Sequence, residues 1–490
     1  MKLLDLVKHL KIFPLPIVED VEINSIEMDS RQVKEGSLFI CIDGFTVDGH
    51  NYVYQAIEAG AVAIIAEKKV DVNVPVIYVN NTNRAMAILA DAFFNFPTKS
   101  FKLIGVTGTN GKTTTTQILT QIFEYYNKVV GTIGTLHIKI GAEIEEVKNT
   151  TPDSLTLQKT FNKMKENNVE AAFIEVSSHA LHLGRVHGCD FDIAVFTNLT
   201  QDHLDYHNTM ENYKNAKGLL FAQLGNTYNI ESPKYSVLNN DDCASKDFAM
   251  MTASHIITYG IDNKSDVMAR NIELTNSGTR FELVTPIGSE VVSIKLIGKF
   301  NVYNILAAVS VSLVYGLSLR QIIEAISDVK GVRGRFEVVD GNHDFTVVVD
   351  YSHTPDSLEN VLITLNQLAT NDLTVIVGCG GNRDKTKRPI MGEIATRLAT
   401  QVVFTSDNPR NEEPEEIIKD IIDGVTKENY SIEIDRRVAI KKAIQNAKKN
   451  DIILIAGKGH ETYQIIKDEV LQFDDVTEAI NAIKDLNQSN

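Results

Sequence analysis

The 490-residue sequence is poor in cysteine. Its four cysteines, Cys41, Cys189, Cys243 and Cys379, lie far apart and form no Cys-x-x-Cys pair. Zinc sites and disulfide frameworks use closely spaced cysteines, so the sequence favours neither of them. A reducing, cytoplasmic environment is the expectation that follows.

The sequence also lacks a long apolar segment. No uninterrupted apolar run reaches the roughly 18–20 residues that a membrane-spanning helix needs. The first ten residues, MKLLDLVKHL, carry Lys2, Asp5 and Lys8 and contain no small-residue cleavage site. We therefore expect an amphipathic helix there rather than a signal peptide, and no membrane partner.

Positive charge is in deficit as well. Lys and Arg total 48 against 64 Asp and Glu, which gives a formal net charge of −16. Nucleic acids and anionic membranes select for clustered Lys and Arg, so neither is expected as the main partner. A small anionic substrate stays possible because a few local cations can hold it. The content of 43% hydrophobic and 23% charged residues is that of an ordinary globular protein.

Apolar runs of strand length alternate with helical stretches, which predicts an α/β architecture. The length predicts about three domains. A break at 95–100, where Pro97 ends a helix, and a second at 329–331 divide the chain into domains 1–98, 99–330 and 331–490. We predict a central parallel sheet around a phosphate loop, closed by a small antiparallel β excursion within 266–297. An N-terminal α/β domain and a C-terminal Rossmann-like domain flank it.

The strongest motif is GVTGTNGKTT at 105–114, between an apolar strand and a helix. Gly108 and Gly111 allow the backbone to approach phosphate oxygens. Lys112 supplies a charge to the β- and γ-phosphates, and Thr113 supplies a hydroxyl to magnesium. Val106 departs from the strict phosphate-loop pattern, which has glycine there. The motif predicts ATP or GTP binding; the alternative is a tight strand-to-helix turn with a surface lysine.

Three downstream segments carry groups suited to metal or phosphate chemistry. Glu175 ends a buried strand, at the edge where open α/β sheets bind ligands; it is either a magnesium ligand or a carboxylate that faces water. The segment TNLTQDHLDYH at 197–207 has two histidines and two aspartates within six residues. These are either metal ligands or capping residues. Lys217 has the local pattern of a solvated helix lysine.

These motifs belong to an ordered set that extends over nearly the whole chain. The set comprises GTNGKTT, EVSSHAL, TNLTQDHLDYH, AKGLLF, GKFNVYNILAA, GRFE, DYSHTPDSL and GGNRDKTKRP. In this order and at these spacings it resembles the Mur ligases, a family of ATP-dependent amide-bond-forming enzymes of peptidoglycan precursor synthesis. Each motif alone is moderately specific, whereas the ordered set is highly specific.

The resemblance implies a two-step reaction. A substrate carboxylate attacks the γ-phosphate of ATP to give an acyl phosphate, and an incoming amine then displaces the phosphate. It also implies two magnesium ions, to which an oxygen-rich site is suited. The implied metal ligands are Thr113, Glu175, His203 and a carbamylated Lys217. The implied catalytic residues are Lys112, Glu175, His203 and Lys217. The implied ATP-binding residues are Gly108, Thr109, Asn110, Gly111, Lys112, Thr113, Thr114, Asn301, Asn304, Arg335 and Asp350.

Within the family, the sequence is similar to the ligase that adds the third residue to UDP-N-acetylmuramoyl-L-alanyl-D-glutamate. The segment DNPR at 407–410 resembles the motif of members that add meso-diaminopimelate, whereas lysine-adding members replace its arginine. Arg410 can pair bidentately with the second carboxylate of diaminopimelate, which lysine lacks. The implied contacts with the UDP-sugar dipeptide are Ser30, Phe45, Thr46, Val47, Thr150, Thr151, Ser177 and Arg185. The implied contacts with diaminopimelate are Arg383, Asp407, Asn408, Pro409, Arg410, Gly457 and Glu461.

Three alternatives remain at this stage. One is the L-lysine-adding ligase of the same family. Another is a ligase like folylpolyglutamate synthase, which shares the central fold; the N-terminal DSR and DGH segments argue against it. The third is a non-catalytic P-loop regulatory protein, which would hydrolyse nucleotide slowly and without response to any carboxylate. We expect a cytoplasmic monomer whose partners are ATP, the UDP-sugar dipeptide and the amino acid.

Overall fold

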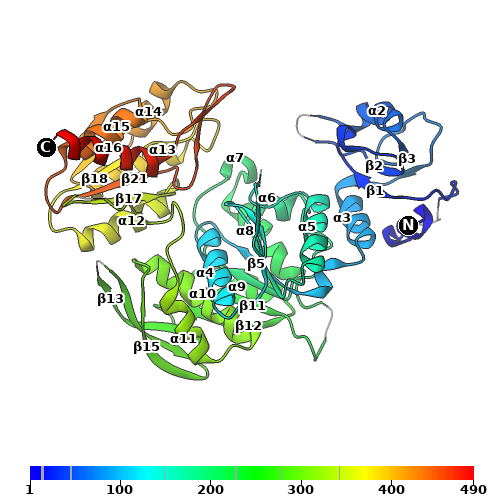
Figure 1. Cartoon of the computed structure of the whole chain (residues 1–490), viewed down its shortest axis with the longest axis horizontal. Coiled ribbons are helices and arrows are strands. Elements are labelled where there is room, and N and C mark those ends of the chain that lie inside the picture. Colours follow the sequence, from blue (N-terminus) through cyan, green and yellow to red (C-terminus); the bar gives the residue numbers. More distant parts are fainter. Residues whose placement is uncertain are drawn as a thin grey trace.

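The computed structural model describes residues 1–12, 16–44, 47–147, 149–226, 229–275, 277–341 and 343–489. These residues form three α/β domains (Figure 1). The N-terminal domain, blue, and the C-terminal domain, yellow to red, stand apart on opposite sides of the central domain, cyan to green. The predicted fold class is thereby confirmed. None of the described helices combines the length and apolar character needed to cross a membrane.

Parallel strands form the N-terminal sheet in the order β1-β2-β3-β4. The predicted amphipathic start is a short helix at Leu3–Val7 followed by a 3-10 turn at Lys8–Leu10. Helix α3 begins where the Asn81 side chain accepts a hydrogen bond of 2.7 Å from the backbone N–H of Arg84, as helix N-caps do. The helix ends ahead of Pro97, as predicted. The elements are α1 (Leu3–Val7), β1 (Ser25–Glu27), β2 (Ser37–Ile40), α2 (Val53–Glu58), β3 (Ala61–Ala66), β4 (Val76–Tyr78) and α3 (Thr82–Phe93).

The described residues of the central domain form an 11-stranded sheet in the order β15-β14-β13-β12-β11-β10-β5-β9-β6-β7-β8. The run from β13 to β6 is parallel, and antiparallel strands extend both edges. The predicted antiparallel excursion is confirmed as β14 and β15, and it continues the parallel sheet. The strands are β5 (Lys102–Thr107), β6 (Val130–Ile133), β7 (Ile138–Ile140), β8 (Glu143–Glu145), β9 (Ala171–Glu175), β10 (Ile193–Phe196), β11 (Tyr235–Asn239), β12 (His255–Gly260), β13 (Val267–Thr275), β14 (Gly278–Thr285) and β15 (Gly288–Ile294).

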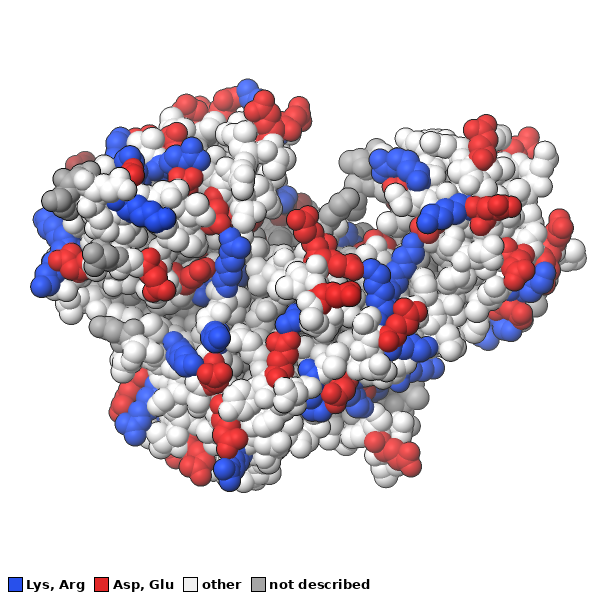
Figure 2. Space-filling model, viewed as in Figure 1, with Lys and Arg blue, Asp and Glu red and all other residues white. Residues whose placement is uncertain are grey.

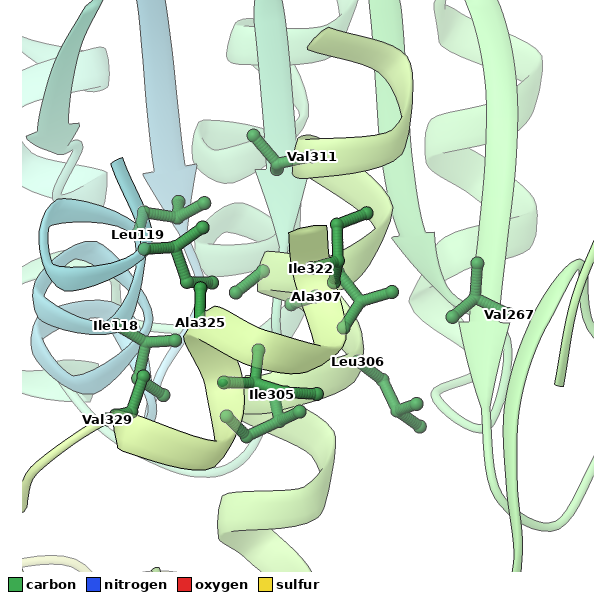
Figure 3. Packing of buried hydrophobic residues seen from close by; sticks show 14 of the residues in the cluster. Ile118, Leu119, Val267, Ile305, Leu306, Ala307, Val311, Ile322, Ala325 and Val329 are labelled. Atoms are coloured by element: carbon green, nitrogen blue, oxygen red, sulfur yellow. The ribbon is translucent and has the colours of Figure 1, made fainter. Parts of the chain in front are cut away.

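Strand β5 is buried on both faces, which explains its continuous apolar sequence. Ile104 and Val106 join the core beneath α4, α10 and α11, whereas Leu103 joins the core on the opposite face. Figure 3 shows Ile118 of α4 and Ile305 of α10 within the first core. The phosphate loop thus leaves the sheet from a rigid central strand. The helices of this domain are α4 (Lys112–Tyr125), α5 (Ser154–Glu166), α6 (Ser178–His182), α7 (Leu204–His207), α8 (Met210–Ala222), α9 (Ala244–Met251), α10 (Lys299–Tyr315) and α11 (Leu319–Asp328).

The described C-terminal domain has a six-stranded sheet in the order β16-β17-β21-β18-β19-β20, parallel except for β16. Separate apolar cores cover its two faces, as in a doubly wound fold. A small hairpin, β22 with β23, follows the last sheet strand. The elements are β16 (Glu337–Val338), β17 (Thr346–Asp350), α12 (Pro355–Leu368), β18 (Leu373–Val377), α13 (Lys387–Leu398), β19 (Gln401–Phe404), α14 (Pro414–Ile422), β20 (Tyr430–Ile432), α15 (Arg436–Asn446), β21 (Ile452–Ala456), β22 (Tyr463–Ile466), β23 (Glu469–Gln472) and α16 (Asp475–Ser489).

The surface charge is mixed rather than segregated. Figure 2 shows acidic and basic side chains interspersed over the face in view, and a hollow between the two outer domains. No broad basic field dominates this face. Extended polyanions need such a field, whereas small anions need only local cations.

Candidate active site

The phosphate loop joins β5 to α4 and is shaped by two glycines. Gly108 and Gly111 have φ angles of +152° and +87°, and a Cβ at either position would lie 1.8 Å from Thr197 Oγ1 or 2.5 Å from Asn304 Oδ1. The segment that follows β10 holds the loop backbone in place, because Asn110 N–H donates to Asn198 Oδ1 at 2.9 Å. Only glycine fits this close approach of loop and neighbouring side chains. The loop geometry therefore matches the motif interpretation of a backbone cradle.

Two lysines converge on this loop. Lys112, at the start of α4, donates from Nζ to the carbonyls of Gly108 and Thr109 at 2.9 and 2.8 Å. Lys217 of α8 donates to the same Gly108 carbonyl at 2.8 Å. Lys217 is only 1% exposed, so the solvated helix lysine that its local pattern indicated is wrong. Burial lowers the pKa of both lysines, and the Lys112 charge adds to this effect at Lys217.

A buried carboxylate faces the start of α4. Glu175, at the end of β9, is 1% exposed and accepts a hydrogen bond of 2.9 Å from Thr113 Oγ1. Thr135 donates to it from its backbone N–H at 2.8 Å and from Oγ1 at 3.1 Å. The alternative of a strand-end carboxylate that faces water is therefore wrong. The result is an oxygen-rich corner beside the phosphate loop.

His203 lies at the start of α7, three residues after Thr200, whose backbone N–H donates to Thr109 Oγ1 of the phosphate loop at 3.0 Å. It has a left-handed backbone with φ of 55°, and its Nε2 is 3.4 Å from Asp202 Oδ2. Burial lowers the pKa of His203 to about 3, so the imidazole is neutral at pH 7 and keeps a lone pair for a metal. Asp202 itself is buried, which contradicts a simple capping loop at this point.

The donor chemistry of these residues fits magnesium. In the described part of the chain, no group of three or more His, Cys, Asp or Glu side chains converges on one point as a ready-made metal cage. Magnesium does not require one, because it binds through one or two carboxylates together with phosphate oxygens and waters. Glu175 and Thr113 offer such oxygens next to the phosphate loop, and His203 offers a neutral nitrogen.

A cavity of about 410 Å³ lies between the phosphate loop, α10 and the start of α12. Asn301 and Asn304 of α10 line it and hydrogen-bond to each other at 3.3 Å. Arg335 reaches in from the C-terminal domain and donates to Thr113 Oγ1 at 3.2 Å. Asp350, at the end of β17, accepts the backbone N–H of Phe336 at 2.7 Å. Predicted nucleotide-binding residues from the central domain and from the C-terminal domain therefore line the same cavity.

Four predicted contacts of the sugar–dipeptide form one network next to Glu175. Thr151 Oγ1 donates to the Glu175 carbonyl at 2.8 Å, and Arg185 donates to the Thr151 carbonyl at 2.9 Å. Ser177 N–H donates to Thr151 Oγ1 at 3.0 Å, and Thr150 Oγ1 lies 3.1 Å from Thr135 Oγ1. This network lies directly beside Glu175 and Thr135.

The remaining predicted sugar–dipeptide contacts belong to the N-terminal domain. Ser30 hydrogen-bonds to Gln55 at 3.0 Å, and Val47 is exposed. Among the described residues, no hydrogen bond connects these two to the Thr151 network. Phe45 and Thr46 lie outside the described residues.

The predicted amino-acid contacts gather at the carboxyl ends of β18, β19 and β21. Asn408 donates from Nδ2 to Glu461 Oε2 at 2.8 Å, and Lys458 Nζ donates to Asn408 Oδ1 at 3.0 Å. Arg410 donates from Nη1 to the Gly381 carbonyl at 2.9 Å. Open parallel sheets bind ligands at this edge. These contacts leave the other guanidinium hydrogens of Arg410 for a ligand.

Backbone geometry and charge set this region apart from an ordinary turn. Arg410 has φ of 53°, and Gly457 has φ of +117°, where a Cβ would lie 2.8 Å from Asp407 Oδ2. Burial raises the pKa of Glu461, with a further contribution from the Asp407 charge. Burial and the neighbouring Arg383 lower the pKa of Arg410. Two neighbouring carboxylates and two neighbouring arginines in a buried site are typical of a binding site for a ligand that carries both positive and negative charge.

One cavity of about 920 Å³ joins the central and C-terminal halves of the site. Its lining includes Asp202 and His203 from the central domain and Asp407, Arg410 and Glu461 from the C-terminal domain. His203 and the predicted amino-acid contacts therefore line the same cavity. The predicted residues Thr109 and Pro409 belong to the loops already described, with Thr109 N–H donating to the Asn198 carbonyl at 2.8 Å. Thr114 lies in α4 and lines the cavity of about 410 Å³.

Sequence reasoning missed four polar residues of the site. None was assigned a role, although Asn198 stands inside the motif TNLTQDHLDYH and Lys387 inside GGNRDKTKRP. Their burial or contacts could not be inferred from local pattern. They are Thr135, Asn198, Lys387 and Lys458.

The fold and site together define a three-domain, nucleotide-dependent ligase. Family models match most of the chain: Mur ligase family, catalytic domain, at residues 22–94; Mur ligase middle domain at 106–312; and Mur ligase, glutamate ligase domain, at 334–459. The chain belongs to the Mur ligase family.

Individual relatives are similar over their full length. The UDP-N-acetylmuramoyl-L-alanyl-D-glutamate–2,6-diaminopimelate ligase of Bacillus cereus is 59% identical over 483 residues, which are 99% of this chain and 98% of that protein. A solved structure of a ligase of the same name has 33% identity and a TM-score of 0.68, covering 96% of each chain. The MurF ligase of Thermotoga maritima in complex with ADP, at 19% identity and a TM-score of 0.66, shares the fold and covers 95% of this chain and 98% of its own.

Proposed function

We propose that this chain is the ATP-dependent ligase that adds meso-diaminopimelate to the D-glutamate of UDP-N-acetylmuramoyl-L-alanyl-D-glutamate. The observation that carries the proposal is the single cavity of about 920 Å³ in which the Asp202–His203 segment faces Arg410 and Glu461. His203, from the segment that contacts the phosphate loop, and a mixed-charge clamp line this one cavity, an arrangement that suits the joining of a carboxylate to a charged amine. The diaminopimelate ligase of Bacillus cereus, 59% identical to this chain, supports the same activity.

In the first step, the substrate carboxylate attacks the γ-phosphate of ATP and ADP leaves. Lys112 and the amides of the phosphate loop hold the β- and γ-phosphates, and Arg335 approaches from the C-terminal domain beside Thr113. Magnesium, when bound, neutralises charge on the transferring phosphate; Thr113, Glu175, His203 and a carbamate on Lys217 would hold it. The protein supplies orientation and electrostatic stabilisation, which account for most of phosphoryl-transfer catalysis.

In the second step, the amine of the amino acid attacks the acyl phosphate, the new C–N bond forms and inorganic phosphate leaves. The amine must lose a proton to attack. The bound amino acid is held from the C-terminal side, so the approach of the two domains brings amine and acyl carbon together. Water excluded from the closed cavity cannot hydrolyse the mixed anhydride.

The distal end of diaminopimelate carries one carboxylate and one ammonium group. We assign the carboxylate to Arg410, with Arg383 nearby, and the ammonium to Asp407 and Glu461. Asn408 orders this clamp, because it links Glu461 and Lys458 through hydrogen bonds of 2.8 and 3.0 Å. Lysine has no distal carboxylate, so it would leave a buried arginine without its partner.

Lys217 is proposed to react with carbon dioxide to give a carbamate, with its amine nitrogen bonding to carbon and one proton released. Burial lowers the pKa of Lys217, so a larger fraction is the neutral amine that this reaction requires. Incubation with ¹³C-bicarbonate followed by ¹³C NMR should give a carbamate signal that is absent in Lys217→Ala. A spectrum without that signal in the active, magnesium-loaded enzyme would contradict the modification.

The N-terminal domain is proposed to bind the UDP part of the substrate through Ser30, Phe45, Thr46 and Val47. Thr150, Thr151, Ser177 and Arg185 would hold the dipeptide part beside Glu175. We further propose domain boundaries at 98/99 and 330/331, and a monomer that acts in the cytoplasm.

The decisive experiment is an ADP-release assay with purified UDP-N-acetylmuramoyl-L-alanyl-D-glutamate, ATP, magnesium and a panel of amino acids. Continuous turnover should require both the nucleotide-sugar dipeptide and diaminopimelate. Equal turnover with L-lysine would favour the lysine-adding alternative. Hydrolysis that ignores both substrates would instead indicate a regulatory P-loop protein.

A further inference from the structure

Lys387 is a buried lysine to which the proposed reaction gives no role. Its side chain is 8% exposed, it is the first residue of α13, and it lines the cavity of about 920 Å³. A lysine side chain at a helix start usually extends into water. Here the ammonium group is enclosed at the boundary between the central and C-terminal domains.

The position of Lys387 is electrostatically unfavourable within its own domain. The start of a helix carries partial positive charge, which repels cations. The next residue, Arg388, is neutralised by hydrogen bonds of 2.9 Å to Glu412 and 2.7 Å to Asp420. Among the described residues, none accepts a hydrogen bond from Lys387 Nζ. Among the described residues, the C-terminal domain therefore neutralises Arg388 and supplies no carboxylate within 4.0 Å of Lys387 Nζ.

The nearest carboxylate to Lys387 belongs to the other domain and is already engaged. Asp202 Oδ1 is 3.7 Å from Lys387 Nζ, beyond hydrogen-bond distance. The same oxygen accepts the backbone N–H of His203 at 2.9 Å. Asp202 Oδ2 lies 3.4 Å from the His203 ring and 3.8 Å from His353. An ammonium group has three donors, so Lys387 retains capacity for an anion in the cavity.

The position of Lys387 in the cavity selects one anion of the substrates. Burial and the nearby charge of Arg383 lower the pKa of Arg410. Both arginines line the cavity with Glu461, where the distal end of the amino acid is proposed to bind. Lys387 instead faces the Asp202–His203 segment, where the acyl phosphate would form. A diamino acid held at its distal end by Arg410 has its second carboxylate at the opposite end, on the same carbon as the attacking amine.

We infer that Lys387 binds the carboxylate adjoining the amine that attacks the acyl phosphate. The inference rests on the proposed ligase function and extends it to the reacting end of the amino acid. Because Lys387 belongs to the C-terminal domain, it holds this end of the amino acid in the same rigid body as Arg410. The attacking amine therefore points toward the central domain when the C-terminal domain approaches it. This contact is shared by diaminopimelate and lysine, so it sets affinity and not the choice between them.

The test compares Lys387→Met with Lys385→Met in the full chain. Lys385 is a matched control, since it lies two residues before α13 but is 63% exposed and pairs with Glu412 at 3.0 Å. Loss of one charge-assisted hydrogen bond should raise the KM for diaminopimelate by about 10- to 100-fold in Lys387→Met. The KM values for ATP and the UDP-sugar dipeptide should stay unchanged, and Lys385→Met should match the unsubstituted enzyme.

A pre-steady-state measurement separates this role from an effect on phosphate. With ATP and the dipeptide but no amino acid, the first burst of ADP should be equal in Lys387→Met and the unsubstituted enzyme. A reduced burst would show that Lys387 acts on the phosphate and would overturn the inference, as would an unchanged KM for diaminopimelate. Lys387→Gln serves if the Met variant does not fold. Failure of the unsubstituted enzyme to use diaminopimelate would contradict the proposed function itself.

Discussion

Asn110 of the phosphate loop donates a hydrogen bond of 2.9 Å from Nδ2 to Oδ2 of Asp356 in the first turn of α12. The two residues are 246 positions apart and belong to different domains. Both line the nucleotide cavity of about 410 Å³. The same loop that cradles phosphate therefore also holds the C-terminal domain in place, so nucleotide binding and domain approach are coupled at this contact.

Replacing Asp356 should weaken ATP binding. Asp356→Ala removes the partner of Asn110 Nδ2, and a net hydrogen-bond contribution of about 0.5–1.5 kcal/mol corresponds to a rise of about 2- to 10-fold in the KM for ATP. The KM for the amino acid should not change. Steady-state kinetics at saturating dipeptide measures both. Glu359→Ala, an exposed position on the same helix paired with Arg397, is the control; an equal effect in both variants would refute the coupling.

Replacing Arg410 by asparagine should abolish the preference for diaminopimelate. Asparagine tolerates the left-handed backbone at φ of 53°, so Arg410→Asn removes the guanidinium without backbone strain. The kcat/KM for diaminopimelate should fall by about 10- to 100-fold, whereas the value for lysine should change little. ATP binding, measured by calorimetry, should survive.

The control for this variant is Lys467→Asn. Lys467 has the same φ of 53° and is exposed on the adjacent hairpin, with its Nζ 3.7 Å from Glu413. It should keep the preference for diaminopimelate. A parallel loss of activity toward both amino acids in Arg410→Asn would assign Arg410 to general folding of the loop.

Arg388 should be a major contributor to the stability of the C-terminal domain. Its side chain is fully buried and binds Glu412 and Asp420. Arg388→Met would remove the buried guanidinium that bonds both carboxylates, while Lys385 stays paired with Glu412 at 3.0 Å. The loss of these charge-assisted hydrogen bonds should cost about 1.5–3 kcal/mol in the free energy of unfolding. Urea unfolding monitored by circular dichroism gives the value. Arg397→Met breaks an exposed pair with Glu359 and should cost at most about 1 kcal/mol; similar losses in the two variants would contradict the assignment.

The stability of the protein should fall in mild acid partly because of His460. Burial, with the positive charges of Arg335 and Arg333, lowers the pKa of His460 to about 3 from its ordinary value near 6.5. Below about pH 6.5 the unfolded chain binds a proton that the folded chain refuses until about pH 3. This group therefore lowers the free energy of unfolding by up to about 1.4 kcal/mol per pH unit across that window.

His460→Gln should remove this contribution. The variant should gain stability relative to the unsubstituted protein as the pH falls from 7.5 to 5, measured by urea unfolding at both values. A stability difference that is the same at the two pH values would refute the assignment to His460.

Much of the architecture follows from the order of apolar runs. The strands Lys102–Thr107, Leu373–Val377 and Ile452–Ala456 coincide with largely apolar runs of the sequence, because strands buried on both faces need continuous apolar residues. The short antiparallel strands β7 and β8 at the sheet edge and the hairpin β22–β23 carry no such signal, since half-exposed edge strands have mixed composition. Glu175, Asp350 and Asp407 likewise lie at or just after strand ends, which is a property of chain order.

The sequence by itself determined the domain number, the phosphate loop with its two obligatory glycines, and the family. Only the tertiary structure decided which polar side chains lose water. Lys217 and Lys387 both resemble surface helix lysines, yet crossover connections place each in a closed space beside Gly108 or Asp202. Burial and charge pairing depend on neighbours that are distant in the chain, and a local pattern carries no information about them. The electrostatic character of the site is therefore a product of the packing of three domains.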